Sequence, residues 1–281
     1  MLAISGRTKL YGVVGFPIRH SLSPLIHNTL FNEFKLDAVY LTFEVLKENF
    51  ENFFKGLKSI NNFVGLNVTV PFKNIVFQYL DKKENELPVN TVLFKKNKSF
   101  GFNTDGYGFE KALLKNYPNF KFKNINVLVL GAGGASFSVI YSLLKKNVNK
   151  IFIANRTLEN AFKLKSKFPK SKKIEIVQLQ NDLLSKLNLD FDLIVNTTSV
   201  GLKNEKSLIK FVKTKKEAIA YDLIYNPPLT DFLKEAKKNG FKILNGLDML
   251  IFQAFKAFEI WTDKKPDKFY EKVYNTLIKN L

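Results

Sequence analysis

Residues 127–136 read Val127-Leu128-Val129-Leu130-Gly131-Ala132-Gly133-Gly134-Ala135-Ser136, and the fold of this chain follows from them. The four apolar residues predict a buried strand, and the helical spacing of the apolar residues over 139–144 predicts a helix after the glycines. Such a glycine turn lets the backbone approach a pyrophosphate, whose charge is met by the N–H groups at the helix start. We therefore expect a Rossmann-type nucleotide-binding fold. Its expected cofactor-binding loop residues are Gly131, Ala132, Gly133, Gly134 and Ala135.

The next strand-like run, 151–154, ends in Asn155-Arg156-Thr157, where an NAD enzyme usually carries an acidic residue that binds the ribose hydroxyls. A carboxylate there would repel a 2′-phosphate, whereas the guanidinium of Arg156 can bind it with two hydrogen bonds. Asn155 and Thr157 would support that contact, so NADP is expected rather than NAD. The alternative is that Arg156 is an ordinary solvated residue after a strand.

Apolar strand-like runs alternate with helical patterns along the whole chain, which indicates an α/β architecture with a mostly parallel sheet and helices on both faces. The predicted strands are residues 10–14, 39–45, 63–68, 127–130, 151–154, 174–179, 193–195 and 218–223.

Two predicted helices join the halves of a two-domain protein. The first runs from about Gly106 to Lys115 with Asp105 as its N-cap, and the second from about Leu247 to Trp261. We expect a discontinuous α/β substrate-binding domain over 1–104 plus 246–281. The Rossmann-like NADP-binding domain would cover 105–245.

Composition restricts the chemistry. The 281 residues are 46% hydrophobic with 28 Phe, which predicts a globular protein, and the absence of Cys excludes disulfides, thiolate metal sites and cysteine nucleophiles. Only two His occur, so no metal site is expected. His27 shares a helical spacing with Leu30, Phe31 and Phe34, which favours a buried helix face over a functional role.

The net charge of +19 raises the possibility of nucleic-acid binding, but the Lys residues stand in short scattered groups typical of a solvated surface. Residues 1–10 contain no secretory signal pattern. The uncharged stretch 124–144 divides into a strand, a glycine turn and a helix, so no membrane span is expected. We expect a cytoplasmic enzyme that is a monomer or homodimer, with small-molecule ligands and no nucleic-acid partner.

Two polar motifs follow apolar runs, Asn67-Val68-Thr69-Val70-Pro71-Phe72-Lys73 and Asn103-Thr104-Asp105-Gly106. The ends of strands are where open α/β sheets present groups to ligands, so Lys73 and Asp105 are expected to form an acid/base pair. Asn67 and Thr69 alternate along one strand and can face the same ligand. A purely structural ion pair is the alternative for Lys73 and Asp105.

Near the N-terminus, Ser21 and Ser23 stand two residues apart before a predicted helix that begins near Pro24. Two hydroxyls beside a helix N-terminus can bind a carboxylate. For Ser23 the alternative is that it serves only as the N-cap of that helix.

Together these motifs resemble the shikimate dehydrogenase family over nearly the whole chain. The matching segments are the serine motif at 21–23, 67–73, 103–106, the glycine loop 131–136, 155–157, 196–201, 222–227 and 246–254. The resemblance implies NADPH-dependent reduction of 3-dehydroshikimate to shikimate, a step of the shikimate pathway toward aromatic amino acids.

The same resemblance implies a role for each matching residue. Ser21 and Ser23 would hold the substrate carboxylate, and Lys73 and Asp105 would be catalytic. The remaining substrate-binding residues would be Asn67, Thr69, Asn90, Tyr225 and Gln253. Thr198 and Gly246 would join the glycine loop and 155–157 in binding NADP.

Three other functions stay open. One is a quinate/shikimate dehydrogenase that uses NAD, against which Asn155 and Arg156 argue. A second is a non-catalytic protein that senses a shikimate-pathway metabolite, which the presence of both Lys73 and Asp105 disfavours. Nucleic-acid binding is the third and rests on charge alone.

Overall fold

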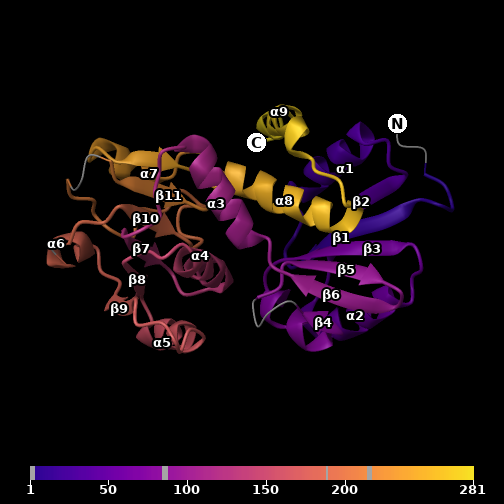
Figure 1. Cartoon of the computed structure of the whole chain (residues 1–281), viewed down its shortest axis with the longest axis horizontal. Helices are drawn as coiled ribbons and strands as arrows, with labels where there is room; N and C mark the ends of the chain where they lie inside the picture. The colour runs from indigo at the N-terminus through magenta and orange to yellow at the C-terminus, as the bar shows by residue number, and fades with distance from the viewer. Residues whose placement is uncertain (1–3, 84–87, 188, 214–216) are drawn as a thin grey trace. The chain divides into compact units, whose positions relative to one another are not determined.

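The computed structural model describes residues 4–83, 88–187, 189–213 and 217–281. The chain divides into two compact units, Met1–Gly108 with Leu250–Leu281, and Phe109–Met249 (Figure 1). The unit boundaries fall within two helices, α3 (Asp105–Asn116) and α8 (Leu247–Thr262).

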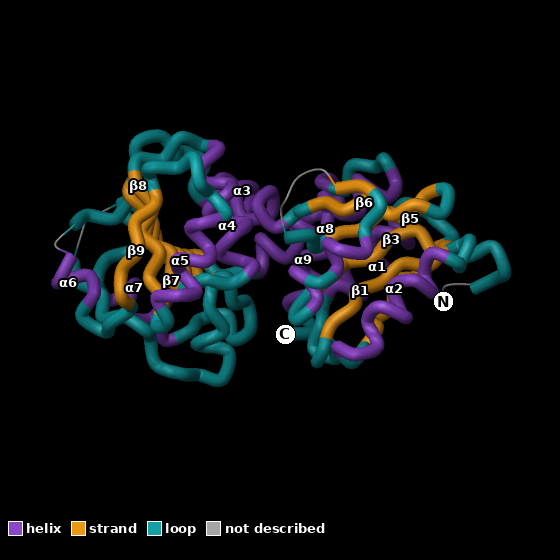
Figure 2. The backbone as a smooth tube through the Cα atoms, turned by 90° about the horizontal axis from the view of Figure 1, so that it is seen from below, coloured by secondary structure: helices purple, strands orange, loops and turns teal. Residues whose placement is uncertain are grey.

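The first unit is built on a sheet that has six strands in the described residues, in the order β2-β1-β3-β5-β6-β4. Their bounds are β1 Lys9–Gly15, β2 Ala38–Glu44, β3 Phe63–Val68, β4 Lys82–Lys83, β5 Thr91–Lys95 and β6 Lys98–Phe102. β1 pairs in parallel with β2 and β3, whereas β5 is antiparallel to both β3 and β6. Figure 2 shows β6, β5, β3 and β1 following one another across this sheet.

Helices cover both faces of this sheet (Figure 1). They are α1 Ser23–Glu33, α2 Phe50–Lys58, the last part of α8, and α9 Tyr270–Ile278, with short 3-10 turns η1 Lys47–Asn49, η2 Phe72–Asn74, η3 Val76–Tyr79 and η4 Asp267–Phe269. Because side chains alternate along a strand, Val14 of β1 packs in the cluster that includes Phe50 and Phe54 of α2, while Tyr11 contacts the rings of Phe31 and Trp261 on the other face.

Gly65 of β3 has a clear packing role. A Cβ at this position would lie 2.5 Å from the Trp261 ring, and the indole N–H donates to the carbonyl of Val92 across 3.0 Å. The missing side chain therefore lets helix α8 press its one tryptophan directly onto the sheet.

The second unit is built on a sheet with strand order β12-β11-β10-β7-β8-β9 among the described residues, and every neighbouring pair is parallel. The bounds are β7 Asn126–Leu130, β8 Lys150–Asn155, β9 Ile174–Gln178, β10 Leu193–Asn196, β11 Ile219–Asp222 and β12 Lys242–Leu244. Counted from β7, the order reads 3-2-1-4-5-6 reversed, which is the doubly wound order of dinucleotide-binding folds. The predicted α/β fold with mostly parallel sheets and a Rossmann-type unit is confirmed.

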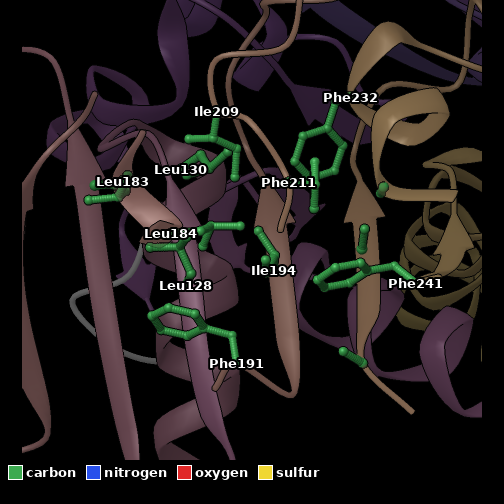
Figure 3. Close-up of a cluster of buried hydrophobic side chains, with 14 of the residues drawn as sticks. Leu128, Leu130, Leu183, Leu184, Phe191, Ile194, Ile209, Phe211, Phe232 and Phe241 are labelled. Carbon is green, nitrogen blue, oxygen red and sulfur yellow. The ribbon is translucent and has the colours of Figure 1, made fainter. Parts of the chain in front are cut away.

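One face of this sheet carries the cluster of buried side chains in Figure 3. Leu128, Leu130 and Ile194 of the strands meet Leu184 and Phe232, which come from α6 and α7. Residues of opposite parity, such as Val127 and Val129, are also fully buried and face the other layer. The helices of this unit, besides parts of α3 and α8, are α4 Gly134–Lys145, α5 Leu158–Ser166, α6 Leu183–Leu187 and α7 Asp231–Lys238.

The stretch 124–144 forms strand β7, the glycine turn and all of α4 except Lys145, as predicted. Within the described residues, no helix combines the length and the apolar character that a membrane span requires.

Candidate active site

An ion pair joins the two polar motifs of the first unit. Lys73 lies in η2 just after β3, where the buried ring of Phe72 stacks on Phe50 and fixes the turn. Its Nζ is 2.6 Å from Oδ2 of Asp105, the first residue of α3. Only 19% of the Lys73 side chain and 9% of the Asp105 side chain are exposed, so the pair is shielded but open at the lysine.

The predicted role of Asp105 as a helix N-cap is wrong. The residue lies inside the helix, and both of its carboxylate oxygens are bonded elsewhere, to Lys73 and to Asn90. The strong bond to a lysine from another segment outcompetes the local bond to the helix N-terminus.

Asn90 orients the carboxylate of Asp105. Its Nδ2 donates to Oδ1 of Asp105 across 2.7 Å and to Oγ1 of Thr104 across 2.9 Å. Its Oδ1 accepts the backbone N–H of Thr104 at 2.8 Å. Both hydrogens and the oxygen of this buried amide are thus occupied within the protein, which fixes the direction from which Asp105 meets Lys73.

Asn67 is held in the same manner. Its Nδ2 donates to the carbonyl of Asn90 at 3.1 Å and to the hydroxyl of Thr91 at 3.0 Å, while its Oδ1 accepts the hydroxyl of Tyr40 at 2.7 Å. The residue is 6% exposed. Its donor capacity is therefore used up, and only a lone pair of Oδ1 is left for a ligand.

Gln253 and Thr69 are half-buried. Oε1 of Gln253 lies 3.5 Å from both Nδ2 of Asn90 and Oγ1 of Thr104, so this residue of α8 belongs to the same cluster. Thr69 follows β3 and its N–H donates to the carbonyl of Val14.

Three residues of this cluster were not among the sequence candidates: Tyr40, Thr91 and Thr104. Thr104 lies inside the motif 103–106 and Thr91 directly follows the candidate Asn90, so their neighbours could have signalled them. Tyr40 is different, because nothing in the local sequence distinguishes it from any other buried strand residue.

Ser23 is not the N-cap of α1, so that alternative is wrong. The helix includes Ser23, its N-cap is Leu22, and no side chain caps it. Instead, the hydroxyl of Ser21 accepts the N–H of Ser23 at 3.3 Å. The structure places the two hydroxyls at the helix start, Ser21 half-buried and Ser23 8% exposed.

His27 lies in the core, as predicted. It is fully buried and stacks on the ring of Tyr40 at 4.4 Å, and within the described residues neither ring nitrogen has a hydrogen-bond partner. Burial lowers the pKa of His27 to about 3, so the imidazole is neutral at physiological pH.

The glycine loop lies between β7 and α4 in the second unit. Gly131 has a φ of +105°, and a Cβ there would lie 2.9 Å from Oγ1 of Thr197 and from Cγ2 of Thr198. Only glycine fits this turn without strain. The N–H of Gly133 donates to the hydroxyl of Ser136, which replaces the third glycine of the usual pattern and also bonds Thr197 at 2.6 Å. Ala132, Gly134 and Ala135 are half-buried beside the start of α4.

Asn155, Arg156 and Thr157 follow β8. Nδ2 of Asn155 donates to the carbonyl of Thr157 at 2.8 Å, and Gln178 donates to the carbonyl of Arg156 at 2.9 Å. These bonds close the turn and leave the Arg156 side chain exposed at the end of the strand.

The three other predicted residues of the second unit lie close to the strand ends. Thr198 follows β10, where its N–H and its hydroxyl both donate to Oδ1 of Asn196. Tyr225 is half-buried after β11, and burial raises the pKa of its hydroxyl. A Cβ at Gly246 would lie 1.9 Å from the carbonyl oxygen of Leu223, so this glycine permits a close approach of two backbones.

The first unit can therefore supply an ammonium positioned by a carboxylate, and the second unit a glycine turn suited to a pyrophosphate. Within the described residues, no group of three or more His, Asp or Glu side chains is arranged to hold a metal ion.

Three family models match the chain in sequence order. They are the shikimate dehydrogenase substrate binding domain over residues 13–91, shikimate / quinate 5-dehydrogenase over 113–224, and the shikimate 5′-dehydrogenase C-terminal domain over 246–278. The chain belongs to the shikimate dehydrogenase family. The resemblance inferred from the sequence motifs is confirmed.

Individual members of the shikimate dehydrogenase family match over nearly their full length. The shikimate dehydrogenase (NADP(+)) of Aquifex aeolicus is 44% identical over 263 residues, which cover 92% of this chain and 93% of that protein. A crystal structure of a shikimate dehydrogenase in complex with NADP+ has a TM-score of 0.88 at 36% identity, covering 99% of this chain and 97% of that one. The Listeria monocytogenes enzyme, solved with shikimate and NAD, has a TM-score of 0.87 at 33% identity and covers 96% of this chain and 97% of its own.

Proposed function

We propose that this chain catalyses the NADPH-dependent reduction of 3-dehydroshikimate to shikimate in the shikimate pathway. The observation that carries the proposal is the Lys73–Asp105 ion pair, held by Asn90 in a shielded cluster. A buried ion pair contributes little net stability, so its presence in a member of an oxidoreductase family favours a catalytic role over a purely structural one.

NADPH supplies a hydride to the carbonyl carbon of the substrate when it is bound. The negative charge that develops on the carbonyl oxygen is then stabilised by the Lys73 ammonium. One N–H bond of Lys73 breaks as an O–H bond forms on the alkoxide, and the neutral amine regains its proton from solvent. Asp105 accepts a hydrogen bond from Lys73 and so holds the ammonium in place for the substrate.

Each proposed substrate-binding residue has its own part. Ser21 and Ser23 are proposed to hold the carboxylate, and Thr69, Gln253 and Tyr225 the ring hydroxyls. Asn67 and Asn90 belong to the same set. Their amides are already bonded within the protein, so we propose that they act mainly by positioning their neighbours.

The second unit fits NADP because the glycine turn is shaped for close approach. The positive φ of Gly131 and the closeness of Thr197 and Thr198 to its missing Cβ describe a cradle that a side chain would fill. The pyrophosphate would lie against residues 131–135, the 2′-phosphate on Arg156 with Asn155 and Thr157, and the nicotinamide half near Thr198 and Gly246. By this proposal 1–104 with 246–281 form the substrate domain and 105–245 the NADP domain.

We propose further that the chain is a cytoplasmic monomer or homodimer without nucleic-acid partners. Many of its lysines pair with nearby carboxylates on exposed surface, as in Lys163–Glu159 and Lys186–Asp182, which is typical of a solvated face. A salt-sensitive mobility shift with duplex or single-stranded nucleic acid would contradict the absence of nucleic-acid partners. Size-exclusion chromatography with light scattering measures the oligomeric state.

The experiment is a grid of two cofactors and two substrates. Initial rates are measured by the absorbance of the reduced cofactor, with NADPH or NADH and with 3-dehydroshikimate or 3-dehydroquinate. We expect the highest kcat/KM for NADPH with 3-dehydroshikimate. A preference for NADH and 3-dehydroquinate would support the quinate/shikimate alternative, and binding of 3-dehydroshikimate with no turnover under any condition would support metabolite sensing.

A further inference from the structure

Asp222, the last residue of β11, is a fully buried carboxylate outside the proposed catalytic and ligand-binding residues. Its Oδ1 accepts Nδ2 of Asn196 at 3.0 Å and the N–H of Ile224 at 3.1 Å, and its Oδ2 accepts the hydroxyl of Thr230 at 2.5 Å. All three donors are neutral. Burial raises the pKa of Asp222 to about 6, so the group is ionised at neutral pH at a cost to stability.

The first of these bonds reaches Thr198 through Asn196. A carboxylate only accepts hydrogen bonds, so Asp222 forces the amide of Asn196 to present its Nδ2. Oδ1 of Asn196 must then face the other way, where it accepts the N–H of Thr198 at 3.1 Å and its hydroxyl at 2.7 Å. The carboxylate of Asp222, together with the carbonyl of Val200 that accepts the same Nδ2 at 3.2 Å, therefore sets the orientation of this amide and the hydrogen bonds that hold Thr198.

The second bond fixes the backbone that leads to Tyr225. Ile224 donates its N–H to Asp222 and accepts the N–H of Gly246 on its carbonyl at 3.0 Å. The carbonyl oxygen of Leu223, the residue before Ile224, lies so close to Gly246 that no side chain fits at position 246. The segment before Tyr225 is thus locked between Asp222 and Gly246.

The third bond closes the loop after Tyr225. Thr230 is the N-cap of α7 and accepts the N–H of Leu233 while it donates to Asp222. Both ends of the segment that carries Tyr225 are therefore tied to the same carboxylate.

We propose that Asp222 is a positioning residue. Its single carboxylate fixes both the orientation of the cofactor-binding Thr198 and the backbone position of the substrate-binding Tyr225. This inference rests on the proposed function, in which Thr198 contacts NADP and Tyr225 the substrate. Asp222 is fully buried and would touch neither ligand, so we expect its substitution to change ligand binding rather than the chemical step.

Asp222→Asn is the main test, because it keeps the shape and removes the negative charge that accepts Nδ2 of Asn196. We expect the Kd for NADP+, measured by calorimetry, and the KM for 3-dehydroshikimate each to rise by about 3- to 10-fold, the size of one lost hydrogen bond. The turnover number should change by less than about threefold. A role confined to stability would leave both binding constants unchanged.

Asn196→Ala separates the two connections. It removes the support of Thr198 but leaves Ile224 and Thr230 bonded to Asp222, so only the Kd for NADP+ should rise. This variant also tests the inference if Asp222→Asn does not fold.

The matched control is Asp192→Asn. It is the same substitution just before β10, at the opposite end of the strand from Asn196, and Oδ2 of Asp192 accepts the N–H of Asn126. It should leave both constants unchanged.

Unchanged binding constants in Asp222→Asn, or in Asn196→Ala where Asp222→Asn does not fold, would overturn the inference, as would a loss confined to kcat. So would equal increases of both constants in Asn196→Ala. These results are distinct from failure of the proposed function, which is a wild-type protein that does not reduce 3-dehydroshikimate. In that case the calorimetric arm with NADP+ still tests the connection to Thr198.

Discussion

Nδ2 of Asn90 lies 2.7 Å from Oδ1 of Asp105, while Lys73 occupies the other oxygen of the same carboxylate. The carboxylate is therefore held from both sides, by a neutral amide and by an ammonium. This arrangement predicts that the reactive lysine depends on residues that need not touch the substrate.

Asn90→Ala should lower kcat more than it changes the KM for 3-dehydroshikimate. The substitution leaves Oδ1 of Asp105 and the N–H of Thr104 without their partner, which costs stability of about 1–3 kcal/mol and lets the carboxylate rotate away from Lys73. Steady-state kinetics and urea unfolding measure the two effects. If KM rose with kcat unchanged, Asn90 would instead be a substrate ligand, as the family resemblance implies.

Lys73→Ala should lower kcat by about 10²- to 10⁴-fold, the usual contribution of a positioned acid/base group. Asp105→Asn should also be severely slowed, because Lys73 then loses its partner at 2.6 Å. The double variant should be little slower than Lys73→Ala alone if the residues act as one unit. Fully multiplicative losses in the double-mutant cycle would show that the two residues act independently.

Arg156→Ala should raise the KM for NADPH and leave the KM for NADH nearly unchanged, since one charge-assisted contact contributes about 1.5–3 kcal/mol. Lys163→Ala is the matched control, because it removes an exposed positive charge from the neighbouring helix α5, where Lys163 pairs with Glu159. Its KM for NADPH should match that of the wild type. An equal loss of both cofactors in Arg156→Ala would remove its assignment to the 2′-phosphate.

The buried His27 predicts a pH dependence of stability. Its pKa falls from 6.5 to about 3 on folding, so the unfolded chain binds a proton below about pH 6.5 that the folded protein rejects. The free energy of unfolding should therefore decrease as the pH is lowered from about 6.5 toward 3, at up to ~1.4 kcal/mol per pH unit. At pH 8 this contribution is absent.

Comparison with His27→Phe, which keeps an aromatic ring against Tyr40, isolates that contribution. Urea unfolding at pH 8 and pH 5 should show the wild type losing about 2 kcal/mol more than the variant over that interval. Parallel losses in the two proteins would mean that His27 is protonated in the folded state.

The sequence predicted most of the architecture because its strands are long and apolar. All eight predicted runs are strands in the structure, including β7 and β8 around the glycine loop. The hairpin of β5 and β6 was missed. Its turn residues Lys96 and Asn97 adopt positive φ values of 51° and 58°, but each flanking strand has only 5 residues, too few for an alternating pattern to be recognised.

The candidate site was predictable in its residues but not in its connections. Lys73 and Asp105 are separated by 32 positions, and the polar ends of two apolar runs were enough to suggest that they meet. The amides of Asn90 and Asn67 hydrogen-bond to other protein groups. These bonds could not be predicted, because they depend on side-chain directions that tertiary packing fixes. Tyr40 was identified only from the structure, and Asp222, although it begins the matching segment 222–227, was given no role from the sequence. A buried hydroxyl or carboxylate at a strand position carries no periodic signal.

The most direct test of the account is the reaction of the purified protein with NADPH and 3-dehydroshikimate, followed by cofactor absorbance and by identification of the product. We predict that one shikimate forms for each NADPH consumed, and that Lys73→Ala binds 3-dehydroshikimate normally yet forms product about 10²- to 10⁴-fold more slowly. A wild-type protein that binds 3-dehydroshikimate and NADPH together without forming shikimate, or a Lys73→Ala variant with wild-type turnover, would contradict it.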